Sequence, residues 1–264
     1  MNYEEINKRS WNNRTDAHYA SDFYDVAHFK KGNTSLNEIE LALLGNVSGK
    51  SILHLQCHFG QDTISLNWLG AQVTGVDLSD VAIAKAQQLA TETNSNATFV
   101  CCNVYDLPKH LNQQFDMVFT SYGTIGWLPN LDDWANVVAH FLKPNGTFVF
   151  VEFHPFVWMY DDAFKNIHYR YFNSGPIVET ESGTYADKDA AITQEYVMWN
   201  HSLSEVVSSL LKNNLSIEQF HEYDYSPYNC FSPTVKVADK KYRIAHLDDK
   251  IPMVYALVAK KKDI

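Results

Sequence analysis

Hydrophobic and polar residues along this chain follow two alternating periods, one typical of strands and one typical of helices. Five short apolar segments predict strands at 51–55, 71–76, 97–101, 115–120 and 147–153. Between them, apolar residues three and four positions apart predict helices, one of which begins after Ser79, a residue suited to cap it. Strands that alternate with helices form βαβ units, so we expect a doubly wound α/β domain with a mostly parallel sheet.

The regular pattern has flanking parts. It lapses from 154 to 200, and then a helix at 203–211 and strands at 215–223 and 253–259 are predicted. No internal repeat or low-complexity linker divides the chain. We therefore expect one domain over 1–264, with four parts: an N-terminal helical extension or lid (1–49), a core (50–153), an insertion (154–200), and a C-terminal helix with two strands (201–264).

Composition and charge exclude several classes of protein. The chain has 264 residues, 45% of them hydrophobic, which is enough for a core. Its net charge of −10 disfavours binding to nucleic acid or to an anionic membrane surface. The polar N-terminus and the lack of a long apolar stretch predict neither a signal peptide nor a membrane span. Four cysteines without a CxxC pair indicate free thiols and a cytoplasmic location.

The first strand and the second strand end in candidate ligand-binding residues. The loop HLQCHFGQD (54–62) places Gly60 just before a helix, and Asp77 ends the second strand. A carboxylate at that point can accept hydrogen bonds from both ribose hydroxyls of a nucleoside, although it can also cap a helix. The loop lacks GxGxxG, which a dinucleotide pyrophosphate requires. A nucleoside without phosphates is therefore the expected ligand.

Five segments together resemble the class I S-adenosylmethionine-dependent methyltransferases, over roughly 50–260. They are ILHLQCHFG (52–60), VTGVDLS (73–79), FVCCNVYDLP (99–108), FDMVFTSYGTIGWL (115–128) and LKPNGTFVFVE (142–152). Cys57 and Gly60 match the family's first motif, whereas His54, Gln56 and His58 replace its acidic residue and two glycines. The variant HLQCHFGQD resembles one uncharacterised bacterial branch of the family. His54 cannot supply the missing negative charge, so another group has to hold the amino group of the cofactor.

The resemblance implies a Rossmann-like sheet of seven strands with an antiparallel last strand, and S-adenosylmethionine as cofactor with S-adenosylhomocysteine as product. Asp77 would bind the ribose and Asn103 the adenine amino group. The full set of expected cofactor contacts is Gln56, Cys57, His58, Gly60, Asp77, Leu78, Asn103, Val104 and Ser121.

Candidate acceptor-side residues surround this core. His154 directly follows the fifth strand, where it is either a general base or a strand cap, and Tyr122 is a second candidate base. His18 and Tyr19 are either lid residues that contact the substrate or packing residues. Trp127 and Trp158 are the other expected substrate contacts.

The insertion is aromatic and acidic. Residues 153–200 include eleven Phe, Tyr and Trp side chains, and residues 151–200 hold eight acids against three Lys or Arg. The aromatics form either a small satellite core or an acceptor pocket under a lid. The excess of acids favours a neutral or cationic acceptor.

Methyl transfer to a small molecule is the predicted activity, of EC 2.1.1 type, by in-line displacement without a protein nucleophile. A non-catalytic module that binds S-adenosylmethionine on the same fold is the alternative. Nucleic-acid methylation is disfavoured, because TSYG follows the fourth strand where the amino-methylating enzymes have [DNS]PP[YFW]. His54, Cys57 and His58 do not have the spacing of a metal site, so no metal is expected.

Overall fold

A single seven-stranded sheet forms the centre of the computed structural model, which describes residues 2–262. The strand order is β3-β2-β1-β4-β5-β11-β8. Their bounds are β1 (Ser51–Leu55), β2 (Gln72–Asp77), β3 (Thr98–Cys101), β4 (Phe115–Ser121), β5 (Leu142–Phe153), β8 (Leu215–Tyr223) and β11 (Val254–Lys261). Strands β1 to β5 pair in parallel, and β11 runs antiparallel to both β5 and β8. The predicted Rossmann-like sheet with an antiparallel last strand is confirmed.

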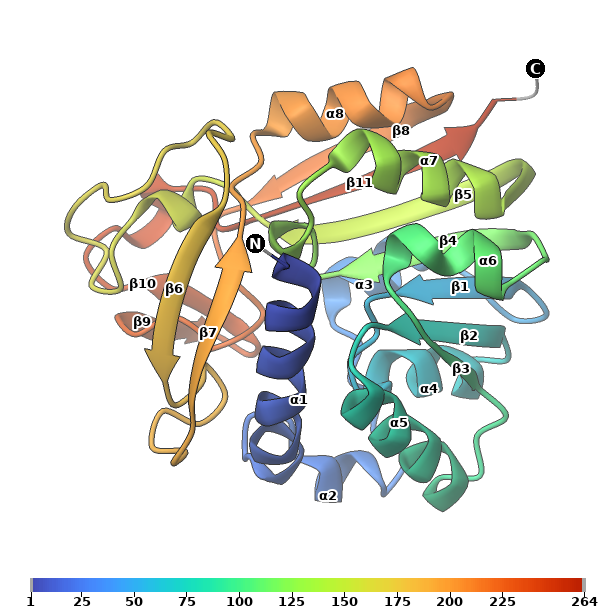
Figure 1. Ribbon diagram of the computed structural model, residues 1–264, viewed down its shortest axis with the longest axis horizontal. Coiled ribbons are helices and arrows are strands. Elements are labelled where there is room, and N and C mark those ends of the chain that lie inside the picture. Colours follow the sequence, from blue (N-terminus) through green and yellow to red (C-terminus); the bar gives the residue numbers. More distant parts are fainter. Residues whose placement is uncertain (1, 263–264) are drawn as a thin grey trace.

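Helices cover both faces of this sheet, with α7 and α8 on one face and α3, α4 and α5 on the other (Figure 1). The helix bounds are α1 (Tyr3–Ala20), α2 (Val26–Phe29), α3 (Glu38–Leu44), α4 (Gln61–Trp68), α5 (Asp80–Glu92), α6 (Leu107–His110), α7 (Leu131–Phe141) and α8 (Leu203–Lys212). Short 3-10 turns lie at Val104–Asp106, Ile125–Trp127, Val157–Met159 and Asp248–Lys250.

Alternation along the strands explains the two layers. In β1, Leu53 belongs to the hydrophobic cluster that includes Trp134 of α7. Its neighbour Ile52 belongs to the opposite cluster, which includes Leu66 of α4. Successive side chains of a strand point to opposite faces, so an uninterrupted apolar strand can pack against helices on both sides.

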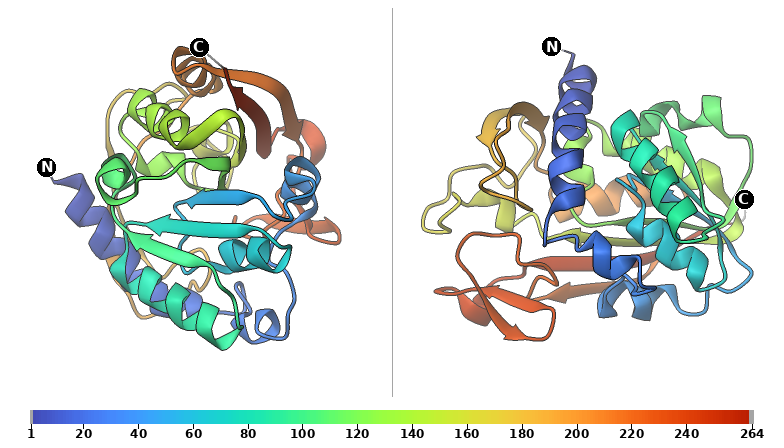
Figure 2. Two further views of the ribbon diagram at one scale, coloured as in Figure 1. Left: turned by 90° about the vertical axis from the view of Figure 1, so that its right-hand side faces the viewer. Right: turned by 90° about the horizontal axis from the view of Figure 1, so that it is seen from below.

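Two hairpins extend beyond the sheet at the end where the parallel strands have their carboxyl termini (Figure 2). The insertion contains β6 (Ile177–Ser182) paired antiparallel with β7 (Thr193–Met198). A second hairpin, β9 (Thr234–Ala238) with β10 (Lys241–Ile244), was not predicted. Val235 and Val237 of β9 are nearly half exposed, so this strand buries no face that a hydrophobic pattern could indicate.

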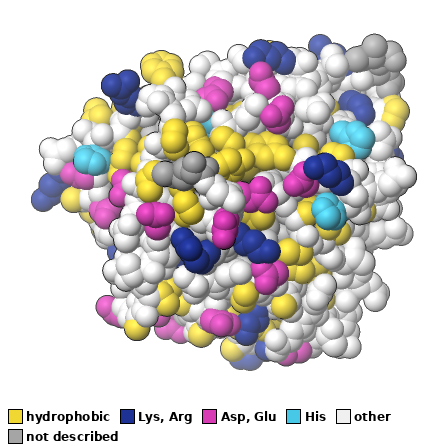
Figure 3. Space-filling view, in the orientation of Figure 1, with side chains coloured by type: hydrophobic (Ala, Val, Ile, Leu, Met, Phe, Trp, Pro, Cys, Tyr) yellow, Lys and Arg dark blue, Asp and Glu magenta, His cyan; other side chains and the backbone are white. Residues whose placement is uncertain are grey.

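Helix α1 joins the insertion to the core. The Asn7 amide donates to the Val197 carbonyl and accepts from the Val197 N–H, both at 2.8 Å, which fixes α1 along β7. Farther along α1, Asn12 donates to Asp80 of α5 at 3.1 Å. Charged side chains of both signs are interspersed over α1 and α5, below a hydrophobic band that runs toward α7 (Figure 3). No helix within residues 2–262 has the length and apolarity to cross a membrane.

Candidate active site

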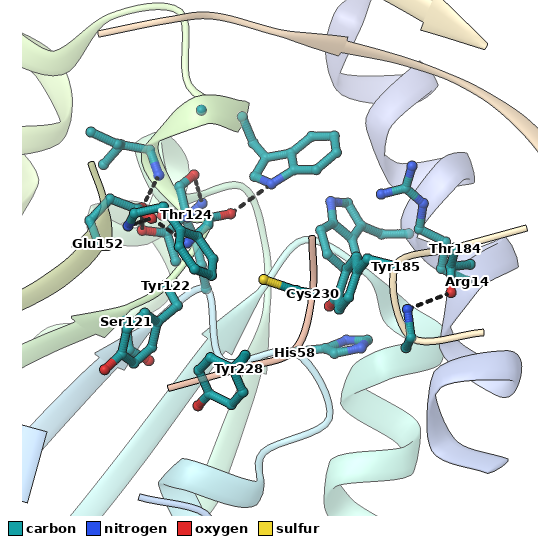
Figure 4. Close-up of a pocket in the computed structure, with 18 of the residues that line it drawn as sticks. Arg14, His58, Ser121, Tyr122, Thr124, Glu152, Thr184, Tyr185, Tyr228 and Cys230 are labelled. Atoms are coloured by element: carbon teal, nitrogen blue, oxygen red, sulfur yellow. Dashed lines mark hydrogen bonds between the residues drawn. The ribbon is translucent and has the colours of Figure 1, made fainter. Parts of the chain in front are cut away.

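A cavity of about 1440 Å³ opens at the carboxyl ends of β1, β2 and β4. Four parts of the chain line it: the loops of the core, α1 and the segment after it, the β6–β7 insertion, and residues 227–242. Figure 4 shows side chains from all four parts pointing toward one space, among them Arg14, Tyr122, Tyr185 and Tyr228. Nearly every contact described below concerns this cavity or its walls.

The loop after β1 has a backbone that ordinarily favours glycine. Gln56 and His58 have φ of 54° and 50°, in the left-handed region, which costs a residue with a side chain about 1–2 kcal/mol. Gly60 has φ of 80°, and a Cβ there would meet the Phe99 ring at 2.7 Å. The loop therefore keeps a glycine-type conformation, although two of the three residues with positive φ are Gln and His.

Asp77 is held at the end of β2 by this loop. One carboxylate oxygen accepts from the His58 N–H at 2.8 Å and the other from the Ser79 N–H at 2.9 Å. Burial raises the pKa of Asp77 to about 6, against the lowering effect of these N–H donors. Each oxygen has a second lone pair, so the carboxylate can still accept two hydrogen bonds from the cavity.

The next strand supplies Asn103, which lines the same end of the cavity with Leu78 and Val104. The Asn103 side-chain oxygen accepts from the Tyr105 N–H at 3.1 Å and caps the short turn at Val104–Asp106. Its oxygen keeps one lone pair and its amide keeps two donors for a ligand.

His54 and Asp62 flank this loop, because His54 is in β1 and Asp62 is in the first turn of α4. His54 is buried, and its Nδ1 lies 2.8 Å from the Thr63 hydroxyl. Burial lowers the pKa of His54 to about 3, so the ring is neutral at physiological pH. Asp62 lines the cavity and accepts from the hydroxyls of Ser35, at 2.6 Å, and Ser121, at 3.3 Å. The carboxylate in this region therefore belongs to Asp62.

Glu152 fixes the loop after β4. Its buried carboxylate accepts from the N–H groups of Gly123, Thr124 and Ile125, and from the Thr124 hydroxyl at 2.9 Å (Figure 4). Burial raises the pKa of Glu152, and the N–H donors oppose that rise. Because these donors bind one side chain of β5, the β4 loop presents Tyr122 and Trp127 to the cavity in a fixed way.

A buried polar chain connects Tyr122 to α3. The Tyr122 hydroxyl donates to Glu40 at 2.8 Å, and Glu40 also accepts from the Asn37 N–H at 2.6 Å. The Asn37 amide donates to the Tyr228 hydroxyl at 2.8 Å. Burial and the charge of Asp62 raise the pKa of Glu40 to about 7, so this carboxyl is poised to gain or lose a proton near neutrality.

Arg14 of α1 lies in an aromatic environment on the side of the cavity that the insertion forms. Its guanidinium carbon is 4.9–5.5 Å from the ring centroids of Trp11, Trp127 and Tyr196. The guanidinium pairs with Glu181 of β6 at 2.9 Å. Among the charged residues that the structure describes along the cavity, ten are acids and three are Lys or Arg. The cavity is therefore predominantly acidic.

Residues 52–146 match the family model described as "Methyltransferase domain". An uncharacterized methyltransferase of Synechocystis is 32% identical over 131 residues, which are 49% of this chain and 59% of that protein. A ubiquinone biosynthesis O-methyltransferase of Chromobacterium violaceum is 29% identical over 101 residues, 38% of this chain and 43% of that protein. The chain thus spans about half the length of these curated relatives.

A solved structure extends the likeness to the whole fold. Geranyl diphosphate C-methyltransferase from Streptomyces coelicolor, crystallised with Mg²⁺, geranyl diphosphate and S-adenosyl-L-homocysteine, superposes with a TM-score of 0.60 at 17% identity. The match covers 99% of this chain and 98% of that one. Residues 52–146 thus match a methyltransferase domain, and the whole chain has the fold of the S-adenosylmethionine-dependent methyltransferases.

The residues of this methyltransferase domain fit the family's cofactor, S-adenosylmethionine. Asp77 offers two free lone pairs for ribose hydroxyls, and the loop above it leaves the Gln56 Oε1 buried without a hydrogen-bond partner. All expected cofactor contacts line the one cavity: Gln56, Cys57, His58, Gly60, Asp77, Leu78, Asn103, Val104 and Ser121. The structure therefore brings together every residue that the sequence predicted for this half of the site.

The expected lid residues of the methyltransferase lie differently. Neither His18 nor Tyr19 is among the described residues that line the cavity. His18 is fully buried with its Nδ1 3.0 Å from Nε2 of His58, and Tyr19 packs on Phe59 at 5.4 Å between ring centroids. His18 and Tyr19 are therefore placed as packing residues and not as lid residues that face the cavity. Side chains on either side of them in the sequence, such as Trp11 and Tyr24, face the cavity instead.

The position of His154 also differs from the expectation. Its Nε2 lies 3.0 Å from Glu222 of β8, and its Nδ1 accepts from the Phe156 N–H at 3.1 Å. Both ring nitrogens are occupied, and His154 is not among the described lining residues. The geometry matches a strand cap, and His154 does not face the cavity although its neighbours Phe153 and Pro155 line it.

The aromatic residues of the insertion both line the cavity and pack on one another. Eight of the eleven line the cavity: Phe153, Trp158, Tyr160, Phe164, Tyr169, Tyr185, Tyr196 and Trp199. Several of these also pack together, as Trp158 does with Phe153 and Phe231. Trp127 and Trp158, the expected substrate contacts, both line the cavity.

Three polar residues near the site were missed. Asp62 lies within HLQCHFGQD, and a carboxylate eight residues after the position of the missing acid is a usable signal. Glu40 and Tyr228 lie outside the five motif segments, so nothing in the sequence around them indicated that they would lie near the site. Within residues 2–262, no group of three or more His, Cys, Asp or Glu side chains is arranged to hold a metal ion.

Proposed function

We propose that this protein transfers the methyl group of S-adenosylmethionine to a neutral or cationic small molecule. The observation that carries this proposal is one continuous cavity, which runs from Asp77, the expected ribose contact, to the aromatic side chains of the insertion. Its acidic lining favours an amine or an uncharged acceptor over a phosphorylated one. In this proposal, residues 50–153 bind the cofactor, and residues 1–49 and 154–200 cover the acceptor.

S-adenosylmethionine supplies an electrophilic methyl group on a sulfonium sulfur. The chain has to hold the acceptor in line with that methyl group and to exclude water, and it needs no nucleophile of its own. Trp127 and Trp158 would bind the body of the acceptor. The β4 loop, fixed by Glu152, would keep the acceptor at a constant distance.

An acceptor hydroxyl also has to lose a proton. Tyr122 would accept that proton while its own hydroxyl hydrogen passes to Glu40, to which it already donates. An amine or thiol that is deprotonated at neutral pH needs no such relay.

Two measurements test the proposal. Calorimetric titration of the protein with S-adenosylhomocysteine should give one site per chain, and incubation with S-adenosylmethionine and a panel of amines, phenols and thiols should methylate at least one class. Absence of binding would contradict the proposal. Binding without transfer to any acceptor would favour the alternative, a non-catalytic binding module, which the side chains of Gln56 and His58 at glycine-type positions support.

A further inference from the structure

Asp62 lies next to the point where the family's first-motif acid is missing. His54 occupies that position, and its ring contacts Thr63, the residue that directly follows Asp62. Asp62 is in the first turn of α4, and the exposed part of its side chain faces the cavity. A carboxylate is therefore present in this corner of the site, but it comes from the helix instead of the strand.

The Asp62 carboxylate has no close positive charge among the described residues. Its donors are two neutral hydroxyls, Ser35 and Ser121, and burial raises the pKa of the carboxyl. Lys240, across the cavity, lowers that pKa less than either serine does. Glu40 adds a second carboxyl nearby, since the charge of Asp62 raises the pKa of Glu40. A buried carboxylate is costly unless a cation or further donors compensate it.

A second acceptor in the same loop is also left without a partner. Gln56 donates its amide Nε2 to the Thr124 carbonyl at 2.8 Å, which directs Oε1 away from that carbonyl. Oε1 is buried and has no hydrogen-bond partner in the described part of the chain. Gln56 and Ser121 line one cavity with Asp62, but Oε1 itself has no exposed surface there, so of these two acceptors only the Asp62 carboxylate is open to a ligand.

We infer that Asp62 replaces the missing first-motif acid and binds the α-ammonium group of the cofactor's amino-acid part. This inference rests on the proposed function, because it assigns one subsite of the same cofactor. The α-ammonium group is a cation with three donors, which suits a carboxylate that still has free lone pairs. The cofactor itself would then compensate the charge of Asp62.

The competing explanation is purely local. An acid in the first turn of a helix is favourable through the helix dipole, whatever the cavity contains. In that case Asp62 would contribute to stability and not to recognition of one part of the ligand. Asp80 offers a matched control, since it is the first-turn acid of α5 and lies on the surface.

The test compares three ligands by calorimetry on the wild type and on Asp62→Asn, which keeps the shape and removes the charge. S-adenosylhomocysteine carries the ammonium and the carboxylate, S-adenosyl-3-thiopropylamine carries the ammonium alone, and 5′-methylthioadenosine carries neither. We expect Asp62→Asn to weaken the first two about 10- to 100-fold and to leave 5′-methylthioadenosine within about twofold. Asp80→Asn should change none of the three.

The outcomes separate the inference from the proposed function. If the wild type binds none of the ligands, the proposed function fails. If the wild type binds them and Asp62→Asn leaves S-adenosylhomocysteine unchanged, or weakens all three equally, the inference fails and the role of Asp62 is structural. Asp62→Ser, which keeps a hydroxyl in the same hydrogen-bond network, serves as the second variant. Loss of 5′-methylthioadenosine binding in both variants would also overturn the inference.

Discussion

The half of the cavity that fits the cofactor and the half that we propose to bind the acceptor, here the cofactor half and the acceptor half, are built differently. The cofactor half consists of loops that end parallel strands, and its key groups are held by backbone N–H donors, as Asp77 is by His58 and Ser79. The acceptor half consists of a helix and two hairpins whose side chains hold one another, as Arg14 and Glu181 do. Main-chain N–H groups keep their positions as long as the fold is kept. The arrangement of side chains that hold one another can be altered by a single substitution. We therefore expect cofactor binding to be the invariant property and acceptor choice the variable one.

The largest expected effect tests the cofactor half. Asp77→Ala removes both ribose acceptors and should weaken S-adenosylhomocysteine about 1,000-fold, because two hydrogen bonds to a charged group are lost. Titration calorimetry measures the change, and Asp80→Ala, an exposed acid three residues later, is the control. An affinity within about threefold of the wild type would show that Asp77 does not bind the ribose.

The next effect concerns the boundary between the halves. Tyr122→Phe removes the hydroxyl that donates to Glu40 and should lower kcat for a hydroxyl acceptor about 10- to 100-fold. For an amine or thiol acceptor kcat should change by less than about threefold, which makes the second acceptor the internal control. Equal losses for both acceptors would indicate that Tyr122 positions the acceptor and moves no proton.

Glu40 gives a smaller effect that depends on pH. Its pKa is about 7 in the folded protein and 4.5 in a model compound, so the folded state binds more protons between these values. Stability against unfolding should therefore fall as pH rises from about 4.5 to about 7, and kcat for a hydroxyl acceptor should rise toward and above pH 7. Urea unfolding at several pH values checks the first trend, and Glu40→Gln should flatten the contribution from this residue. A wild-type stability that rises through this range, unchanged by Glu40→Gln, would contradict it.

The smallest effect on turnover is expected at His154. His154→Gln should leave kcat within about twofold, because both ring nitrogens are bound on the side away from the cavity. It should lower the free energy of unfolding by about 1 kcal/mol through the lost contact with Glu222. A drop of tenfold or more in kcat with unchanged stability would restore His154 as a catalytic residue.

The sequence allowed the core to be predicted well because its signals are local. Strands such as 51–55 are short, apolar and bounded by turns, and Asp77 ends one of them. The hairpins gave weaker signals: β6 alternates half-buried and exposed residues, and the valines of β9 face solvent. Glu40 was hidden for another reason. It completes a capping box with Asn37, so its local role accounts for it, and its contact with Tyr122 exists only after the chain has folded.

The contacts of α1 with two parts of the molecule have a consequence for how ligands enter and leave the cavity. The same helix is tied to the insertion through Asn7 and Val197 and to the N-cap of α5 through Asn12 and Ser79. Helix α1 thus connects both parts of the cavity wall. It cannot move away from one part without straining its contact with the other. We therefore expect the cofactor and the proposed acceptor to enter and leave the cavity through one movement of α1.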